Sequence, residues 1–169
     1  YLYLGKCSDY AQYACIWKRD YMNVTYSGVL APSVRKQVEV LQAEMLKFPQ
    51  FEPPTEHIFH GGMYCRQVSI PAGCTIVGKK HKQDHFFMVM SGEVRIVDDG
   101  EAQTVCAPAL IKSVAGVKRA IYAITDTVFM TFHATDAITV EQAEETLVEF
   151  DASSPFTLGN KIEVKLCHS

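Results

Sequence analysis

Apolar and polar positions first repeat along the chain with a helical period. Between residues 34 and 46 the apolar side chains recur at every third or fourth position, with charged side chains between them. These apolar positions are Val34, Val38, Leu41, Met45 and Leu46. The spacing predicts an amphipathic helix that begins near Pro32 and ends in the proline-rich turn of residues 47–54.

From residue 55 to residue 136 the pattern changes to short apolar or alternating runs. The runs are separated by turn residues such as Pro71-Ala72-Gly73 and Ser91-Gly92, at intervals of roughly ten residues. Strands with this spacing predict an antiparallel sandwich or barrel. In the run HFFMVM (85–90) both alternating faces are apolar, so we expect its outer face to be covered by the helix or by a second subunit.

The two ends of the chain differ from this middle part. Residues 1–31 are rich in aromatic side chains without a clear period, and they suit an arm that packs on a neighbouring subunit or covers its own barrel. Within residues 137–169, the run ITVEQAEETLVEF predicts an acidic helix with Thr139 as its N-cap, and the tail alternates like an edge strand. We therefore divide the chain into segments 1–31, 32–54, 55–136 and 137–169.

Length and charge narrow the classes of function. The 169 residues form most simply one domain, and a net charge of -3 gives no broad positive field for general binding of nucleic acid. No apolar stretch approaches the roughly 20 residues of a membrane-spanning helix. The opening YLYLGKC has no basic flank or long apolar core, so we do not expect a secretory signal, although further residues should precede Tyr1. The six cysteines contain no CxxC pair and suit free thiols in a reducing compartment.

Residues 73–92 carry the first part of a two-part signature. Its two glycine positions fall on Gly73 and Gly92, its two histidine positions fall on Lys79 and His81, and its glutamate position falls on His85. This spacing resembles the first motif of the cupin family, whose members are small double-stranded β-helix barrels.

The second cupin motif is similar to residues 114–123. Gly116 matches it, while Val114 stands at its proline position, Arg119 at its histidine position and Ala123 at its asparagine position. The resemblance implies a mainly β, cupin-like jelly-roll barrel with one helix before it and a short helix after it. Of the four metal positions in the family, only His81 keeps its residue, so the resemblance implies the fold and not the family's activity.

Several phrases also resemble small cupin-like proteins encoded by tailed bacteriophages. These are MLKFPQ (45–50), IPAG (70–73), GKKHKQDH (78–85), GVKRAIY (116–122) and HATD (133–136). The resemblance implies an accessory or virion-associated protein, in the host cytoplasm or on the virion, that acts by assembly or small-ligand binding rather than catalysis. Its expected partners are further copies of itself and other virion proteins, with the arm and Phe86, Met88 or Met90 in the contacts between subunits.

Three interpretations of the barrel mouth stay open. In the first, His81, His85 and His133 bind one divalent transition metal, such as zinc, iron, nickel or manganese. The protein would then be a metal-dependent isomerase, epimerase or dioxygenase, in which Lys79 and Arg119 orient a small acidic substrate. Those two cations would also disfavour a metal ion close to them.

In the second interpretation the mouth is a basic pocket for a small acidic ligand, with no metal. Its lining would be Lys79, His81, Lys118 and Arg119, with Tyr64 and Tyr122 as hydrogen-bonding walls. In the third, these side chains are ordinary rim residues of a structural barrel that needs no cofactor.

Overall fold

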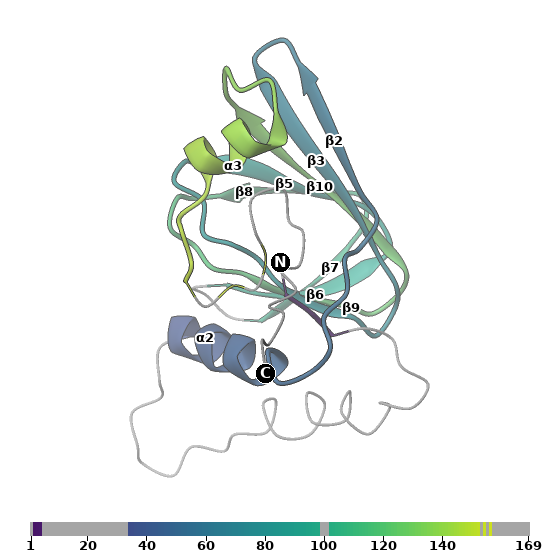
Figure 1. The fold of residues 1–169 in the computed structure, drawn as a ribbon. Coiled ribbons are helices and arrows are strands. Elements are labelled where there is room, and N and C mark those ends of the chain that lie inside the picture. The colour runs from purple at the N-terminus through teal and green to yellow at the C-terminus, as the bar shows by residue number, and fades with distance from the viewer. Residues whose placement is uncertain (1, 5–33, 99–101, 153, 155, 157–169) are drawn as a thin grey trace.

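The computed structural model describes residues 2–4, 34–98, 102–152, 154 and 156. These residues form ten strands in two five-stranded sheets and two helices (Figure 1). Sheet A contains, in spatial order, β1 (Leu2–Leu4), β4 (Thr75–Val77), β9 (Ala120–Ala123), β6 (Glu93–Val97) and β7 (Gln103–Cys106). Sheet B contains β2 (Thr55–His60), β3 (Met63–Ile70), β10 (Thr127–Ala134), β5 (His85–Ser91) and β8 (Ala109–Ser113). Apart from β1, the arm of residues 1–31 lies outside the described residues, and so does the final strand expected at the C-terminus.

The order of the strands defines the fold. Strands β3 to β10 are arranged as β3-β10-β5-β8 in sheet B and as β4-β9-β6-β7 in sheet A, and all neighbours are antiparallel. This is the arrangement of an eight-stranded jelly roll made of two Greek keys. The cupin-like double-stranded β-helix expected from the sequence is confirmed, and β1 and β2 each extend one sheet by an edge strand.

The register of sheet B arranges its inward side chains in rows that cross five strands. The row nearest the end of β10 is Phe59, Tyr64, His133, His85 and Ser113, where His133 and His85 lie one residue beyond the Phe132–Phe86 pair. The next row is His57, Arg66, Thr131, Phe87 and Ile111. The third is Thr55, Val68, Phe129, Val89 and Ala109. The inside of the barrel is therefore polar at one end, and each successive row of side chains is more apolar than the one before it.

The apolar end of the barrel forms the main core. Phe87 and Phe129 pack with ring centroids 5.1 Å apart, and Val68 and Val89 are completely buried beside them. From sheet A, Val94, Ile96 and Ile76 complete the same cluster. Burying such side chains is the main source of stability in a fold of this size.

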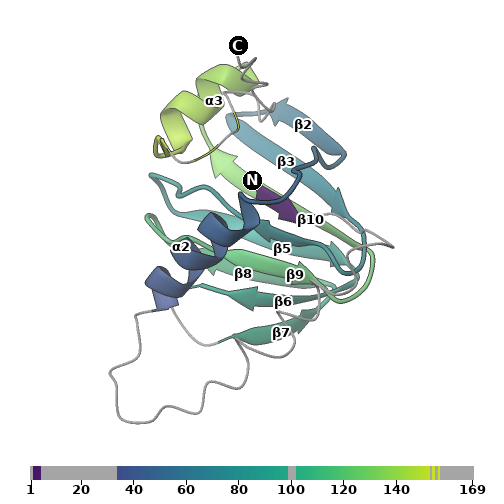
Figure 2. The same cartoon turned by 60° about the horizontal axis from the view of Figure 1, so that its bottom comes forward.

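The first helix, α2 (Val34–Met45), covers sheet A. Its Val38, Leu41 and Met45 are buried in the main core, and in Figure 1 it lies beneath β6 and β9 (Figure 2 shows it from another side). Of the two covers expected for the strand HFFMVM, the helix was wrong, because that strand lies in the opposite sheet, and a second subunit stays a prediction. Phe86 is 45% exposed on the outer face of sheet B, and Leu110 on the neighbouring strand is 61% exposed.

The second helix, α3 (Val140–Leu147), lies at the opposite end of the barrel (Figure 1). The predicted N-cap is confirmed, since the side chain of Thr139 accepts a hydrogen bond from the backbone N–H of Gln142 at 3.3 Å. Ala143 and Leu147 pack with Tyr64 in a small second core. Neither helix among the described residues is both long and apolar enough to cross a membrane.

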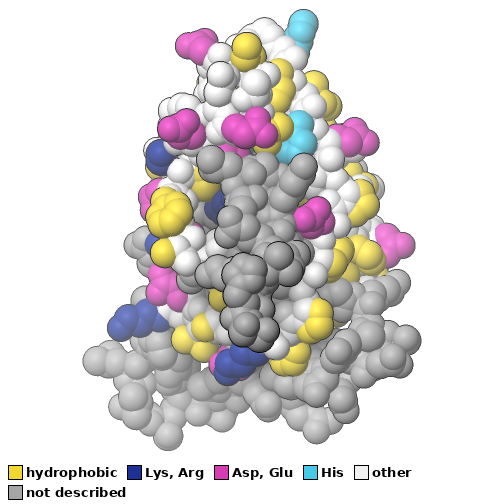
Figure 3. Space-filling view, in the orientation of Figure 1, with side chains coloured by type: hydrophobic (Ala, Val, Ile, Leu, Met, Phe, Trp, Pro, Cys, Tyr) yellow, Lys and Arg dark blue, Asp and Glu magenta, His cyan; other side chains and the backbone are white. Residues whose placement is uncertain are grey.

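Acidic, basic and hydrophobic side chains are interspersed over the face shown in Figure 3. Among the residues coloured there, no single type forms a continuous charged patch on that face. This distribution agrees with the small net charge of -3.

One turn glycine provides a test of the barrel. Gly92 has φ +85, and a Cβ at this position would contact the backbone oxygen of Asp126 and approach Thr127 Oγ1 to 2.6 Å. We expect Gly92→Ala to lower the free energy of unfolding by ~3 kcal/mol, because strain and a collision with backbone add together. Urea denaturation measures the loss.

Gly73→Ala is the matched control, because Gly73 has a similar φ of +82 but no heavy atom within 4 Å of the added carbon. It should lower stability by only about 1 kcal/mol, which reflects the backbone conformation alone. Equal losses in the two variants would show that the contact with Asp126 does not constrain the β5–β6 turn.

Candidate metal centre

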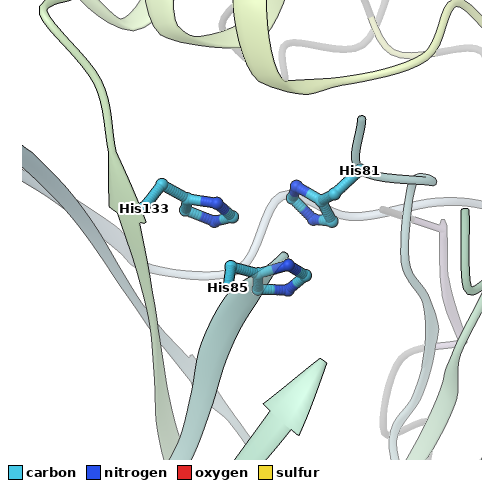
Figure 4. Close-up of side chains that lie close together, drawn as sticks. All are labelled: His81, His85 and His133. Carbon is cyan, nitrogen blue, oxygen red and sulfur yellow. The ribbon is translucent and has the colours of Figure 1, made fainter. Parts of the chain in front are cut away.

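Three histidines meet at the polar end of the barrel. His85 begins β5, His133 lies near the end of β10, and His81 lies in the loop between β4 and β5. Their imidazoles face one another in Figure 4, with ring centroids 4.3 to 4.7 Å apart. One nitrogen from each ring can be chosen so that all three lie within 4.8 Å of one another.

Different parts of the fold hold these three side chains. His133 and His85 are neighbours in one row of sheet B, so the pairing of β10 with β5 sets their separation. His81 is held by its backbone, which forms a bridge with Val148 just after α3 and accepts a hydrogen bond of 2.8 Å from the N–H of Gly116. A further backbone bond runs from the N–H of Lys82 to the carbonyl of Leu147 at 2.8 Å. The loop that carries His81 is thus fastened to both α3 and the turn at Gly116.

Burial keeps the three imidazoles neutral. His133 is only 2% exposed, and this burial, with the repulsion that a protonated His85 would add and the charge of Arg66, lowers its pKa to about 3. Burial is also the main cause of the lowered pKa values of His81 and His85, and the charge of Arg119 lowers both further. At neutral pH each ring therefore has a free nitrogen lone pair, which is the form that binds metal ions.

Hydrogen bonding also fits a metal ion. Nδ1 of His81 and Nδ1 of His133 are buried and have no hydrogen-bond partner, although buried polar atoms are normally paired. In a tetrahedral site with metal–nitrogen bonds of 2.0–2.1 Å, the ligand nitrogens lie ~3.4 Å apart. The ligand nitrogens would have to approach one another by up to ~1.4 Å, which rotation of the three side chains can provide. The residues present therefore fit a metal ion held by three imidazoles.

Two cations stand beside the histidines, as expected from the sequence, but each has a carboxylate partner. Lys79 pairs with Glu144 of α3 at 3.4 Å, and Arg119 pairs with Asp98 at 3.5 Å. Burial lowers the pKa of Lys79, and the charge of Glu144 opposes that shift. These carboxylates reduce the repulsion that the two cations would exert on a metal ion.

Tyr64 lies next to the histidines on the inner face of β3. Its ring stacks beside His133 with centroids 6.1 Å apart, and its hydroxyl group lies 2.7 Å from Nδ1 of His57. Burial is the main cause of the lowered pKa of His57, so this ring is a suitable acceptor for the tyrosine proton at neutral pH. Tyr64 therefore forms one wall of the site.

Two other residues proposed for a basic pocket are not brought to the histidines. Lys118 forms an ion pair with Asp151 at 3.1 Å and lines a cavity of about 430 Å³ beside α2. Tyr122 pairs across the sheet with Arg95, so it lies on the outer face of sheet A, opposite to the inward Ile121. The pocket expected from the sequence does not form as a unit, because side chains of successive residues in extended chain point in opposite directions.

Arg66 and Thr131 are inward residues that the sequence analysis did not identify. They face each other directly across β3 and β10, in the row next to the histidines. The signal that could have found them is a polar residue at an inward position of an otherwise apolar alternation, as in MYCRQVSI and TVFMTFHA. Burying a polar side chain costs free energy, so such a position is informative.

Comparison with known proteins gives matches in structure only. No family model matches the chain, and no curated protein matches its sequence. A cupin-2 domain protein from Shewanella frigidimarina is similar with a TM-score of 0.41 and 17% identity, covering 56% of this chain and 91% of its own. A cupin-family protein with a double-stranded β-helix fold from Methanocaldococcus jannaschii has a TM-score of 0.43 and 16% identity, covering 50% and 81%.

An acetylacetone dioxygenase from Acinetobacter johnsonii is similar with a TM-score of 0.41 and 14% identity, covering 47% of this chain and 58% of its own. The solved structures that resemble this one thus include cupin proteins. The class of protein is nevertheless defined by the strand order and the site described above: a jelly-roll barrel with three converging histidines.

The lowered histidine pKa values predict how stability depends on pH. In the unfolded chain His133 titrates near 6.5, whereas in the fold its pKa is about 3, so between these values the unfolded state binds more protons. We expect the metal-free protein to lose stability as pH falls below about 6.5, by up to ~1.4 kcal/mol per pH unit for each such histidine. Urea denaturation with a chelator, from pH 7.5 to pH 4.5, measures this slope.

The variant His133→Phe removes one of these histidines and should flatten the slope, whatever its effect on stability at pH 7.5. His60→Phe, at an exposed position of β2, is the control and should keep the wild-type slope. A slope that is the same in all three proteins would mean that burial does not hold His133 neutral.

Proposed function

We propose that this protein binds one divalent transition metal ion through His81, His85 and His133 and acts with it on a small acidic molecule inside the barrel. The observation that carries the proposal is the meeting of three imidazoles whose ligand nitrogens lie within 4.8 Å of one another. When bound with an open position, such an ion supplies Lewis-acid chemistry that polarises an oxygen of the bound molecule. The reactions open to such a centre are isomerisation, epimerisation and dioxygenation.

The chemistry of the ligands favours some metals over others. Imidazole nitrogen suits zinc, iron, nickel and copper, whereas manganese prefers carboxylate oxygens. All three proposed ligands are imidazoles, and the nearby carboxylate of Glu144 faces Lys79. Of the metals expected from the sequence, zinc, iron and nickel therefore suit the site better than manganese.

The surrounding residues prepare the site in three ways. Tyr64 and Phe87 place aromatic rings at its walls, which limits access of water. The buried ion pair of Lys79 with Glu144 fastens α3 beside the loop of His81. Arg119 adds positive charge at the base of the site, with its guanidinium carbon 5.1 Å from the ring centre of Phe87. A bound molecule that carries negative charge would be stabilised there.

Metal content tests the proposal. Untagged protein, purified without chelator, should contain close to one zinc, iron or nickel per chain by elemental analysis. His85→Ala and His133→Ala should lose this metal, with affinity reduced at least tenfold, because two imidazoles cannot hold the ion as three do.

His60→Ala, which removes an exposed histidine outside the site, should keep the wild-type metal content. If wild-type protein holds no metal even after incubation with zinc, iron or nickel salts, the proposal fails. The histidines would then be structural residues of the barrel.

A second function is favoured by the outer face of sheet B. Phe86, Met88 and Leu110 lie side by side on this face, and β10 adds Phe132 next to Phe86. Apolar side chains gathered on a sheet surface usually mark a site of contact with another protein. We propose that a second copy of the chain packs on this face, and that the protein is an accessory or virion-associated protein of a tailed bacteriophage. The motifs from MLKFPQ to HATD support that origin.

Charged substitutions on this face test the assembly. Phe86→Glu and Leu110→Glu should convert an oligomer into monomers in sedimentation velocity, because a carboxylate cannot be buried there without a partner. Ile138→Glu is the control, since Ile138 is highly exposed near α3 and not on sheet B. A wild-type protein that stays monomeric at high concentration would exclude assembly through this face.

A further inference from the structure

The row of inward side chains next to the histidines contains an arginine and a threonine, between His57 on one side and Phe87 on the other. Arg66 and Thr131 are directly opposite each other on β3 and β10, and Phe87 is opposite Thr131 on the other side. Arg66 is 6% exposed and Thr131 is 3% exposed. Both side chains therefore lie inside the barrel rather than at its rim.

The distances between strands bring this row within reach of the histidines. Side chains directly opposite in an antiparallel pair have Cβ atoms ~5 Å apart, and diagonal neighbours lie ~7–8 Å apart, within reach of a long side chain. His133 is the diagonal neighbour of Arg66 and follows Thr131 by two residues on the same face of β10. Arginine and threonine can thus both contact a molecule that also contacts a metal ion on His133.

The hydroxyl group of Thr131 belongs to an inward residue that lies directly opposite Arg66. Its Oγ1 is buried and has no hydrogen-bond partner, which is unfavourable for a polar group inside a protein. A valine of the same shape would fill the space without that penalty. The hydroxyl group is therefore available as a hydrogen-bond donor to a bound molecule.

We propose that Arg66 and Thr131 form the subsite that recognises the carboxylate group of a small organic acid. This inference rests on the proposed metal centre, because the carboxylate would lie between the guanidinium group and the open position of the metal. Arginine donates two parallel hydrogen bonds to a carboxylate, and the threonine hydroxyl adds a third donor.

Position favours Arg66 as the residue that contacts a carboxylate. It lies in the row next to the histidines, directly opposite Thr131, whose buried Oγ1 has no hydrogen-bond partner. The walls beside Arg66 are flat rings, with Tyr64 and His133 stacked at an interplanar angle of 27°. A planar carboxylate can lie flat against such a ring surface, whereas a tetrahedral phosphate group cannot.

The test uses protein loaded with Co(II), whose visible absorption reports both metal binding and changes in the metal's ligands. Sodium acetate is titrated into the loaded wild-type protein and into Arg66→Gln and Thr131→Val. We expect a saturable change in the wild-type spectrum, at least tenfold weaker acetate binding in Arg66→Gln, and roughly fivefold weaker binding in Thr131→Val. Arg95→Gln, an arginine on the outer face of sheet A, is the control and should bind acetate as the wild type does.

Stability gives a second measurement that a purely structural role would not produce. Thr131→Val should be as stable as the wild type or more stable in urea, while it binds acetate less well. If Arg66→Gln does not fold, Arg66→Lys keeps the charge but loses the paired donors, and it should still bind acetate more weakly.

Each outcome separates the two proposals. If the wild type binds Co(II), and the Arg66 and Thr131 variants bind acetate as tightly as the wild type does, the proposed subsite is wrong. The proposed metal centre is not affected by that result. If wild type binds no Co(II), the metal centre fails and the subsite fails with it. If inorganic phosphate binds more tightly than acetate and depends on Arg66, the assignment of the ligand as a carboxylate is wrong.

Discussion

The pairing of β10 with β3 on one side and with β5 on the other is the constraint on which the site depends. This register places His133 beside His85 and Tyr64, and it places Thr131 between Arg66 and Phe87. A slip of one residue would turn every one of these side chains to the outer face. The apolar row of Phe129 and Val89 opposes such a slip, because it would expose the core to water. Packing of the apolar end of the barrel thus fixes the positions of the polar side chains at the other end.

Charge inside the barrel is arranged so that the imidazoles can remain neutral. Burial and the charges of Arg66 and Arg119 lower the histidine pKa values, and the carboxylates of Asp98 and Glu144 lie against Arg119 and Lys79. Three neutral rings give a metal ion no compensating negative charge, unlike a ligand set that contains a carboxylate. The site would therefore gain most from an anionic ligand, which agrees with a guanidinium group in the neighbouring row.

The sequence predicted more of the fold than of the site. Turn residues such as Gly92 and the spacing of the runs predicted an antiparallel sandwich or barrel, and the resemblance to the cupin motifs implied a jelly roll. A centre shared by three histidines was one of three interpretations that the sequence left open. The sheet that α2 covers could not be predicted, because an amphipathic pattern shows which face of a helix is buried but not which surface it packs against. Arg66 was missed, and Tyr122 was placed in the pocket, because each depends on which alternating face turns inward.

The three histidines also differ in how firmly their backbone is held. Two stand on neighbouring strands in the middle of a sheet, while His81 stands on a loop fastened by α3 and the turn at Gly116. Strands at the centre of a sheet open only when the whole domain unfolds, whereas loops and short terminal helices open locally and far more often. The lifetime of a bound ion would therefore be set by the detachment of a single short helix. In kinetic terms, local opening of α3 would control release of the ion, while the barrel strands keep the other two histidines in place.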